Sequence, residues 1–384
     1  MKKVMMYSSV HIWKDARIFF KEAQSLSKEY QVDFYAIGCP GEADKYETEN
    51  LKIHLLPKRS RSKRYKNWII LLKEIKKSKA SIYHYHDPEL LLLLPFLRKK
   101  RKDNIFIYDM HENFPKSLVS KNWIPKFFKK ILMTIVIPLE RVLIKKNKGL
   151  IFAERSYKED YKSILPHLNT CEIYNYPHYR PPNLTINKEV KKEEIRFVYI
   201  GRIAVVRGIW EMLSAINKVT KNSSKKIKFR LIGQCEEELL EDIQYYINKH
   251  HLEDVVEYSA FIEYDKIWNI YQESDIGFCL LHPIPNYMES IATKMFEYMA
   301  SGIPMIISDF PLWNSILKES KNGIAVDPFD ELQLEEAMSK LIENSELRKK
   351  YGINGRREYE IKFNWFNEEK KLTKFYNQLI ETDV

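Results

Sequence analysis

One stretch of the chain, residues 286–309, combines side chains that can hold an anion and a polyol. Its pattern predicts a loop, a helix that begins near Ser290 or Ile291, and a following strand. The start of a helix offers free N–H groups and the positive end of the helix dipole, which together bind anions. Thr293 adds a hydroxyl group there, and Lys294 adds a positive charge.

Two carboxylates in this stretch have the reach to bind hydroxyl groups. Glu297 lies one turn into the predicted helix, where its carboxylate can accept hydrogen bonds from the two adjacent hydroxyls of a ribose. Glu289 precedes the helix and can reach a second polyol. The alternative is that Glu297 is a solvated helix residue and Glu289 a loop charge, because short patterns of this kind often match by chance.

A second segment with suitable chemistry is the loop after a strand that ends at Ile200. Gly201 and Gly208 bracket Arg202 and Arg207, which lie five residues apart. Guanidinium groups pair with phosphate through two parallel hydrogen bonds, so this loop suits a diphosphate. The alternative is a pair of surface arginines without a ligand.

Histidines and carboxylates also follow three strands predicted in the N-terminal half. They are His11, Asp15 and Arg17, then residues 84–89, and then residues 108–115. His84, His86 and His111 beside carboxylates allow a metal site, but their spacing matches no standard zinc pattern and we predict none. The chain also has no Asp-x-Asp pair, which favours a diphosphate held by Arg and Lys. Asp87 before Pro88 is a candidate helix N-cap.

Short apolar runs alternate with amphipathic helical patterns along the whole chain. Runs near residues 3–8, 31–37, 81–85, 104–109 and 149–153 predict buried strands, and a second series runs from 195–200 to 324–326. This alternation predicts parallel sheets with helices on both faces. Ligands of such sheets bind at the carboxyl ends of the strands, which is where the residues above lie.

The proline-rich polar segment 175–183 separates the two series and is typical of an interdomain linker. We therefore predict an α/β fold with two Rossmann-like, doubly wound domains that face each other across a cleft. The predicted boundaries are 1–178, 179–360 and a final helical segment 361–384. A chain of 384 residues has the length expected for two domains.

Charge divides the two halves of the chain. Residues 1–178 carry 35 lysines and arginines against 19 acidic residues, a net charge of +16, whereas the remainder carries 28 against 33. The basic half therefore predicts an anionic partner. Glycine is scarce, with only 11 residues, which argues against a glycine-rich fingerprint as the site of the chemistry.

The cysteines and the apolar runs of the sequence indicate in which cellular compartment the protein is expected. The four cysteines form no CxxC pair, so we expect neither disulfides nor a zinc site, and a reducing compartment fits. The apolar run at the N-terminus is too short for a signal peptide. No apolar run approaches the roughly 20 residues that a transmembrane helix needs.

Three cationic clusters lie in the N-terminal half, at residues 58–66, 98–102 and 121–148. The third mixes lysines with Trp123, Phe127 and Phe128, and contains a single acidic residue, Glu140. A basic helix with aromatic residues suits an anionic membrane surface, to which each cation contributes about 1 kcal/mol. The alternative for any one cluster is an ordinary solvated face. Nucleic acid is a second alternative, but no recognition module accompanies the cations and we expect no such partner.

The pair of glutamates resembles a signature of the GT-B glycosyltransferases, specifically the retaining family 4. Glu289 and Glu297 match the Glu-x7-Glu pattern of that family, and residues 293–304 look like its bacterial polysaccharide branch. The resemblance implies that Glu297 would hold the nucleotide ribose and Glu289 the hydroxyls of the donor sugar. It also implies that His111 would contact the donor sugar from the N-terminal domain, and that the final helix would cross back to that domain.

The arginine loop resembles the Gly-Arg…Lys-Gly loop of the same family, with arginine in place of the usual lysine. The loop after the first strand, residues 8–13, departs from the Gly-Gly loop that the family often has. By resemblance, the arginine loop and the helix start would hold the diphosphate. The residues concerned are Gly201, Arg202, Arg207, Ala292, Thr293 and, as a weaker contact, Lys294.

The activity implied is the retaining transfer of a hexosyl or N-acetylhexosaminyl group from a UDP- or GDP-linked sugar to a saccharide acceptor. The basic half favours a lipid-linked acceptor and an anionic membrane surface, so we expect a cytoplasmic protein at the inner face of the cell membrane, active in polysaccharide synthesis. No cofactor or metal is expected, because arginines and a helix start can stabilise the leaving diphosphate. A nucleotide-sugar epimerase and a phosphorylase are alternatives on the same fold.

Overall fold

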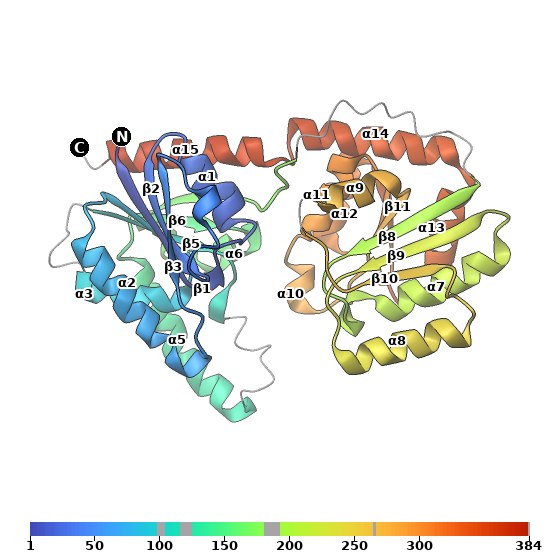
Figure 1. Cartoon of the computed structure of the whole chain (residues 1–384), viewed down its shortest axis with the longest axis horizontal. Helices are drawn as coiled ribbons and strands as arrows, with labels where there is room; N and C mark the ends of the chain where they lie inside the picture. Colours follow the sequence, from blue (N-terminus) through green and yellow to red (C-terminus); the bar gives the residue numbers. More distant parts are fainter. Residues whose placement is uncertain (98–103, 116–124, 180–192, 264–265, 383–384) are drawn as a thin grey trace. The chain divides into compact units, whose positions relative to one another are not determined.

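Two parallel β-sheets organise the chain (Figure 1). The structure is a computed structural model that describes residues 1–97, 104–115, 125–179, 193–263 and 266–382. Its first unit consists of Met1–Asn175 together with Trp365–Val384, and its second unit of Tyr176–Asn364. These boundaries lie a few residues away from the predicted ones at 178 and 360. The predicted fold class, two α/β domains each built on a doubly wound parallel sheet, is confirmed.

The first unit contains a seven-stranded sheet with the order β3-β2-β1-β4-β5-β6-β7. Every neighbouring pair is parallel. Its strands are β1 (Lys3–Ile12), β2 (Gln31–Ile37), β3 (Leu51–Leu56), β4 (Ile82–Tyr85), β5 (Ile105–Met110), β6 (Gly149–Phe152) and β7 (Asn169–Glu172). The runs that predicted β1, β4, β5 and β6 are mostly apolar because both faces of these strands are covered, whereas β2 alternates between buried and partly exposed residues.

The two strands that the apolar runs did not predict, β3 and β7, lie at the edges of this sheet. In β3, the exposed Lys52 and His54 alternate with the buried Leu51. In β7, the sequence Asn-Thr-Cys-Glu has no buried residue at all. An edge strand with one solvated side carries no continuous apolar run, so this signal does not detect it.

The first unit contains short and long helical segments within its described residues. They are η1 (Ile18–Ala23), α1 (Gln24–Leu26), η2 (Asp44–Tyr46), η3 (Arg61–Lys63), α2 (Tyr65–Lys77), η4 (Pro88–Leu93), α3 (Leu94–Leu97), α5 (Lys126–Ile144), α6 (Arg155–Asp160), η6 (Leu165–His167) and α15 (Trp365–Glu381). The helix predicted over 15–29 is shorter in the structure, where the π-helical segment η1 continues into α1.

Helix α15 belongs to the first unit, where it packs against β7 and η1. Its Trp365 side chain donates a hydrogen bond to the hydroxyl of Ser25 (2.9 Å), and the hydroxyl of Tyr376 lies 2.7 Å from Nδ1 of His84. Trp365 and Tyr376 are both fully buried. The last helix is therefore an integral part of the core of the first unit.

The second unit contains a six-stranded parallel sheet with the order β10-β9-β8-β11-β12-β13. Its strands are β8 (Glu194–Ile200), β9 (Lys226–Ile232), β10 (Val256–Ser259), β11 (Ile276–Cys279), β12 (Met305–Ser308) and β13 (Gly323–Val326). Its helices are η7 (Val205–Arg207), α7 (Ile209–Asn222), α8 (Glu237–Lys249), α9 (Ile267–Glu273), α10 (Pro285–Met288), α11 (Thr293–Ser301), α12 (Pro311–Ser320), α13 (Glu331–Glu343) and α14 (Ser345–Ile361). The described part of the chain contains no helix with the length and hydrophobicity to cross a membrane.

Glu140 is a buried carboxyl group on α5, and it should make stability depend on pH. The hydroxyl of Tyr161 donates a 2.7 Å hydrogen bond to its Oε2, yet burial raises the pKa of Glu140 to about 7. In the unfolded chain the pKa of a glutamate is about 4.3. The folded state thus holds the proton more tightly, so stability is fully present below pH 4 and falls as the pH rises to about 7.

We expect Glu140→Gln to remove this part of the pH dependence. Because glutamine stays neutral and still accepts from Tyr161, the variant should exceed the wild type by up to about 3 kcal/mol at pH 8 and match it near pH 4.5. Urea unfolding at both pH values measures the difference. Glu336→Gln, at an exposed position of α13, is the control. Equal wild-type and Glu140→Gln stabilities at pH 8 would contradict the assignment.

Candidate functional site

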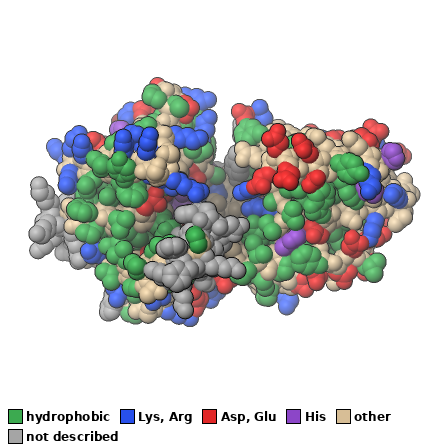
Figure 2. All heavy atoms as spheres, turned by 90° about the horizontal axis from the view of Figure 1, so that it is seen from below, with side chains coloured by type: hydrophobic (Ala, Val, Ile, Leu, Met, Phe, Trp, Pro, Cys, Tyr) green, Lys and Arg blue, Asp and Glu red, His purple; other side chains and the backbone are tan. Residues whose placement is uncertain are grey.

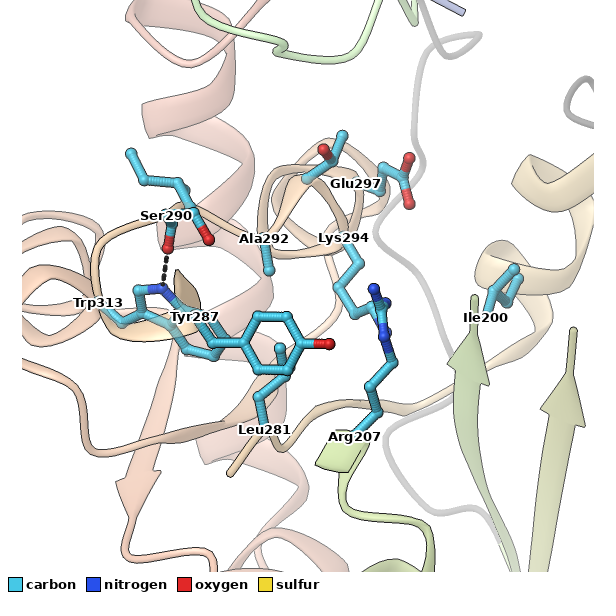
Figure 3. A pocket seen from close by; sticks show the side chains of 11 residues that line it. Ile200, Arg207, Leu281, Tyr287, Ser290, Ala292, Lys294, Glu297 and Trp313 are labelled. Atoms are coloured by element: carbon cyan, nitrogen blue, oxygen red, sulfur yellow. Dashed lines mark hydrogen bonds between the residues drawn. The ribbon is translucent and has the colours of Figure 1, made fainter. Parts of the chain in front are cut away.

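A cavity of about 330 Å³ opens in the second unit beside the start of α11 (Figure 3). It lies at the carboxyl ends of two adjacent strands, because Ile200 ends β8 and Leu281 follows β11 by two residues. Ligands of open α/β sheets bind at this edge. Five of the predicted residues line the cavity: Arg207, Ala292, Thr293, Lys294 and Glu297.

The first turn of α11 supplies an anion-binding surface. Thr293 begins the helix, and its N-cap residue, Ala292, has an extended conformation and no side chain that accepts from the helix. The start of the helix therefore presents backbone N–H groups and the positive dipole end to the cavity, without a capping carboxylate or hydroxyl to neutralise them. α11 has nine residues, so the aligned peptide dipoles of more than two turns contribute to the positive end of the helix.

Packing against the sheet fixes the position of α11. The hydroxyl of Tyr298, which is fully buried, donates a 2.8 Å hydrogen bond to the carbonyl oxygen of Phe278 in β11. Gly277 makes room for this ring, since a Cβ atom there would lie 2.6 Å from it. The preceding loop is held by Trp313, whose indole N–H donates to the carbonyl oxygen of Ser290 at 2.8 Å. The helix start is therefore preorganised.

Glu297 is a buried carboxylate that lies on the wall of the cavity. The hydroxyl of Tyr271, on α9, donates a 2.8 Å hydrogen bond to its Oε2. A carboxylate has about four lone-pair sites, and the hydroxyl of Tyr271 occupies one of them. Tyr271 thus orients the carboxylate and does not saturate it.

Lys294 is a buried cation on the wall of the cavity. It is 8% exposed, and its Nζ has no hydrogen-bond partner among the described residues. The ammonium group lies 3.5 Å from the ring centroid of Tyr199, a cation–π contact. An ammonium group that lacks its hydrogen bonds is costly to bury, so an anionic ligand in the cavity would remove an existing penalty.

Gly201 directly follows β8 and lies close to the side chain of Lys294. Its φ of +146° lies in the region that favours glycine, and a Cβ atom would come within 3.3 Å of the Nζ of Lys294. Glycine at position 201 therefore relieves backbone strain and leaves the ammonium group of Lys294 room beside the loop that follows β8.

The two loop arginines take different positions. Arg207 ends η7 and lines the cavity, with its guanidinium carbon 5.6 Å from the ring centroid of Tyr287. Arg202 is exposed and is not among the cavity-lining residues, and its guanidinium pairs with Glu236 at 2.9 Å. Exposed pairs of this kind contribute little and exchange readily. The structure thus brings one of the two predicted arginines to the cavity.

Glu289 lies at the C-terminus of α10, outside the cavity lining. Its side chain is exposed, and its backbone N–H donates to the carbonyl oxygen of Pro285 at 3.2 Å. The next residue, Ser290, lines the cavity. Glu289 is therefore at the rim of the cavity, and its predicted role toward a donor sugar stays a prediction.

In the first unit, His111 follows β5 and is held by Asp109. Its Nε2 lies 2.7 Å from Oδ2 of Asp109, which is fully buried. The guanidinium group of Arg17 donates hydrogen bonds of 2.9 and 3.1 Å to the two carboxylate oxygens of Asp109. The guanidinium of Arg17 holds the pKa of Asp109 well below its usual range, although burial alone would raise it. An ionised Asp109 fixes the ring of His111 and the proton on its Nε2.

Two other carboxylates that follow strands in the first unit bind backbone or side-chain groups nearby. Asp15 caps the first helical segment, because its Oδ1 accepts from the backbone N–H groups of Arg17 and Ile18 at 2.9 Å each. Asp87, predicted as an N-cap, does not cap η4 with its side chain. Its carboxylate instead accepts from the hydroxyl of Ser8 at 2.9 Å and from the backbone N–H of Ser9, two residues that lie within β1 and not in a loop after it.

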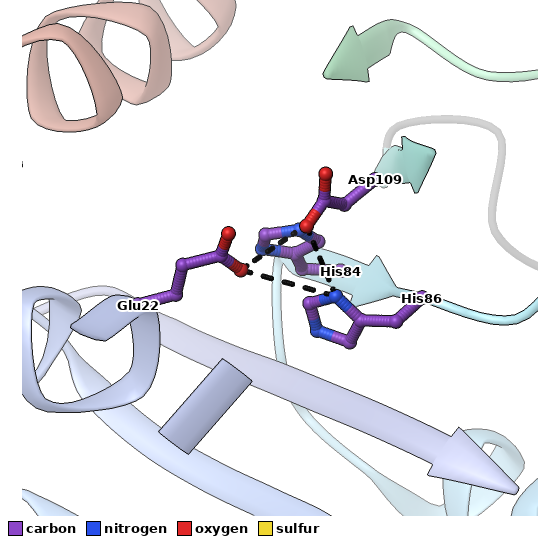
Figure 4. A group of neighbouring side chains, drawn as sticks. All are labelled: Glu22, His84, His86 and Asp109. Atoms are coloured by element: carbon purple, nitrogen blue, oxygen red, sulfur yellow. Dashed lines mark hydrogen bonds and ion pairs between the residues drawn. The ribbon is translucent and has the colours of Figure 1, made fainter. Parts of the chain in front are cut away.

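Four buried side chains of the first unit form a cluster with metal-ligand chemistry (Figure 4). One ligand atom from each of Glu22, His84, His86 and Asp109 lies within 4.8 Å of the others. Arg17 contacts both carboxylates, with its Nε 2.9 Å from Oε1 of Glu22, so a cation already balances part of their charge. Burial and the neighbouring Asp109 raise the pKa of Glu22, and burial lowers the pKa of His86 to about 4. The cluster is also joined internally, since Nδ1 of His86 lies 3.2 Å from Oδ2 of Asp109.

The residues that orient the cavity side chains carry no signal of their own in the sequence. Tyr271 lies on α9 among apolar neighbours, and Tyr199 and Trp313 fit the patterns of an ordinary strand and helix. In the first unit, Glu22 was missed for a similar reason, because it is a charged residue within an amphipathic segment. Only its distance to Arg17 and His86 in the folded chain reveals its place in the cluster.

Comparison with known proteins identifies the fold and one domain. Residues 183–358 match the family model described as glycosyl transferases group 1. An uncharacterized glycosyltransferase of Methanocaldococcus jannaschii is 24% identical over 194 residues, which cover 50% of this chain and 47% of that protein. Spore coat protein SA of Bacillus subtilis is 23% identical over 372 residues, with coverage of 93% and 92%. The chain spans about half the length of the first of these relatives.

Solved structures share the complete architecture. Sucrose-phosphate synthase from Thermosynechococcus elongatus has a TM-score of 0.74 at 15% identity, and 100% of both chains is covered. The HepE protein of Anabaena, in complex with UDP, has a TM-score of 0.71 at 12% identity and covers 98% of this chain and 100% of its own. Together with the family match, these likenesses confirm the resemblance to the GT-B glycosyltransferases.

Proposed function

Since this chain has the fold of the GT-B glycosyltransferases and a glycosyl transferases group 1 domain, we propose that it transfers a sugar from a nucleoside-diphosphate donor to a saccharide acceptor. One observation carries the proposal. A single cavity of the second unit joins a buried cation without hydrogen bonds, an uncapped helix start and an oriented carboxylate. These are the complements of a diphosphate and of the two hydroxyls of a ribose.

The donor would lie along α11. The diphosphate would contact Lys294, Arg207 and the N–H groups near Ala292 and Thr293, and the ribose would contact Glu297 one turn further on. Arg202 would join the diphosphate after leaving its exposed partner, Glu236. The complexes of HepE with UDP and with UDP-glucose support a UDP-linked sugar, and a GDP-linked sugar remains the second option.

The cavity suits the departure of a diphosphate. When the bond between C1 of the sugar and the diphosphate oxygen breaks, negative charge develops on the leaving group. A preorganised cation and helix start would stabilise that charge. We infer that the acceptor oxygen then bonds to C1 on the same face of the sugar, and that the acceptor proton passes to the leaving phosphate. This route is retaining, and it needs neither a carboxylate nucleophile nor a metal ion.

The sugar itself would be a hexosyl or N-acetylhexosaminyl group, contacted by Glu289 and His111. The ionised Asp109 behind His111 supports this role, because it fixes one imidazole N–H and leaves Nδ1 to accept from a sugar hydroxyl. The basic half of the chain favours a lipid-linked acceptor. The reaction would then take place in the cytoplasm, at the inner face of the cell membrane, in the synthesis of a surface polysaccharide.

Product analysis tests the proposal. The protein, in buffer with EDTA, is incubated with UDP-glucose, UDP-N-acetylglucosamine and GDP-mannose, each with and without a lipid-linked saccharide fraction. We expect nucleoside diphosphate release from one donor that depends on the acceptor, and an anomeric NMR signal that shows retention. An epimer formed from donor alone identifies an epimerase, and release that needs orthophosphate identifies a phosphorylase. Either result would overturn the proposal.

A further inference from the structure

Helix α5 carries a row of apolar side chains on its solvent side. Ile135 is 60% exposed and Val142 is 58% exposed, and Leu132 and Leu139 are also exposed. Residues at spacings of three, four and three lie on one face of a helix, so the four side chains form a continuous row. We name this row the α5 stripe.

Other side chains of α5, beside the stripe and across from it, attach the helix to the first unit. Leu143 and Ile144 are buried in the apolar core, and Glu140 is buried with its Oε2 on the hydroxyl of Tyr161. The helix therefore places a carboxyl group inside and a row of isoleucine, leucine and valine outside. An arrangement that exposes large apolar side chains in a continuous row is typical of a docking surface.

Neighbouring elements extend the apolar surface. Segment η4 contacts both α5 and α2, and α3 follows η4 directly. Leu92 on η4, Phe96 on α3 and Ile69 on α2 are exposed, with Phe96 the most exposed of the three. Figure 2 shows hydrophobic side chains gathered beside Lys and Arg on the face of the first unit that it presents.

The part of the chain that contains this surface is predominantly basic in sequence. Residues 58–148 carry 24 lysines and arginines against seven acidic residues, so this segment alone accounts for the positive charge of the first unit. Among the described residues of this segment, Lys58, Arg61, Lys63 and Lys66 are exposed. No acidic residue occurs between residues 50 and 73. The predicted clusters at 98–102 and in the aromatic part of 121–131 lie outside the described side chains.

We propose that the α5 stripe is the element by which this protein inserts into the interface of an anionic lipid membrane. The apolar side chains would enter the boundary between headgroups and acyl chains, and the surrounding cations would pair with lipid phosphates. Charge complementarity selects this occupant, because a row of apolar residues amid cations fits anionic headgroups, whereas a second copy of the chain would bring its own cations to the contact.

This surface deepens the proposed function, because it would hold the first unit at the membrane where a lipid-linked acceptor resides. The proposal can nevertheless fail on its own. Membrane binding is measured without donor or acceptor, so an absence of binding leaves transfer to a water-soluble acceptor intact, and an absence of transfer leaves the binding result intact.

Vesicle co-sedimentation tests the proposal. The full chain is mixed with vesicles of phosphatidylcholine alone or with 30% phosphatidylglycerol, at low and at high salt. We expect binding to the anionic vesicles only, and a fall at high salt because the cations are screened. The double variant Ile135→Ser/Val142→Ser should lose at least about tenfold in affinity, since each side chain no longer buries its apolar surface.

Two comparisons keep the result decisive. Leu332→Ser replaces an even more exposed apolar side chain on α13 of the second unit and should leave vesicle binding unchanged. Thermal unfolding of each variant shows whether it is folded. Wild-type protein that ignores anionic vesicles, or a double variant that binds them as tightly, would overturn the proposal. So would a dimer in solution that the double variant converts to monomer, since the stripe would then face a second copy.

Discussion

Replacing Glu297 by glutamine is expected to weaken the binding of the cognate nucleoside diphosphate by about 10- to 100-fold. A carboxylate that accepts from two ribose hydroxyls makes charge-assisted hydrogen bonds, each contributing about 1.5–3 kcal/mol. The glutamine side chain has the same shape and still accepts from Tyr271, so the fold and the cavity should persist. Isothermal titration calorimetry with UDP and GDP measures the loss.

The position of Glu297 predicts a further contrast. Because the carboxylate is assigned to the ribose, Glu297→Gln should leave the affinity for inorganic pyrophosphate within about twofold. The exposed Glu336→Gln variant of α13 controls for the loss of a negative charge in the same unit. If pyrophosphate and nucleoside diphosphate lose affinity by the same factor, the carboxylate does not act on the ribose.

Replacing Lys294 by methionine should have the opposite ligand profile. Lys294 is assigned to the diphosphate, so we expect about 10- to 100-fold weaker binding of both pyrophosphate and nucleoside diphosphate, because a charge-assisted contact is lost. The free protein should not lose stability, since the substitution removes a buried ammonium group that lacks hydrogen bonds. The contact with Tyr199 offsets part of that penalty in the wild type.

Chemical denaturation with and without ligand separates the two effects of Lys294→Met. The free energy of unfolding without ligand should equal that of the wild type or exceed it by about 1 kcal/mol, while the stabilisation by nucleoside diphosphate disappears. Lys340→Met, at an exposed position of α13, is the matched control and should change neither quantity. A large loss of stability in the free Lys294→Met protein would show that the lysine serves packing and not a ligand.

Much of the architecture follows from patterns that are local in the sequence. Central strands such as β4 and β5 are buried throughout and mostly apolar, because both faces of the sheet are covered, and the alternation with helices implies parallel pairing. The edge strands β3 and β7 lack this signal because one side is solvated. The segment after Asp15 was predicted as a single helix, but no local pattern indicates its π-helical start.

The candidate site also combines features that the sequence predicts with features that only the folded structure reveals. The start of α11 was predictable because a strand, a loop, a hydroxyl, a lysine and a glutamate follow each other in the chain. The different positions of Arg202 and Arg207 were not predictable, because both residues follow the same strand. In the structure Arg202 pairs with Glu236, which lies in another loop, and Arg207 lines the cavity. The role of Tyr271 depends on the packing of α9 beside α11, which the sequence of either helix does not encode alone.

The α5 stripe also required the structure. Its sequence is apolar around the helix, so the pattern alone does not say which side chains the core takes. The burial of Leu143 and Ile144 decides it, and leaves Ile135 and Val142 exposed.

Hydrogen–deuterium exchange with a bound nucleoside diphosphate is the most direct measurement of where the donor binds. The protein is labelled in EDTA-containing buffer with and without saturating UDP, and with GDP in a parallel series. One of the two nucleotides should slow exchange in peptides that cover residues 200–209 and 287–301, and should leave α8 and the first unit unchanged. Protection confined to other segments, or no protection by either nucleotide at concentrations that saturate binding, would contradict the assignment of this cavity.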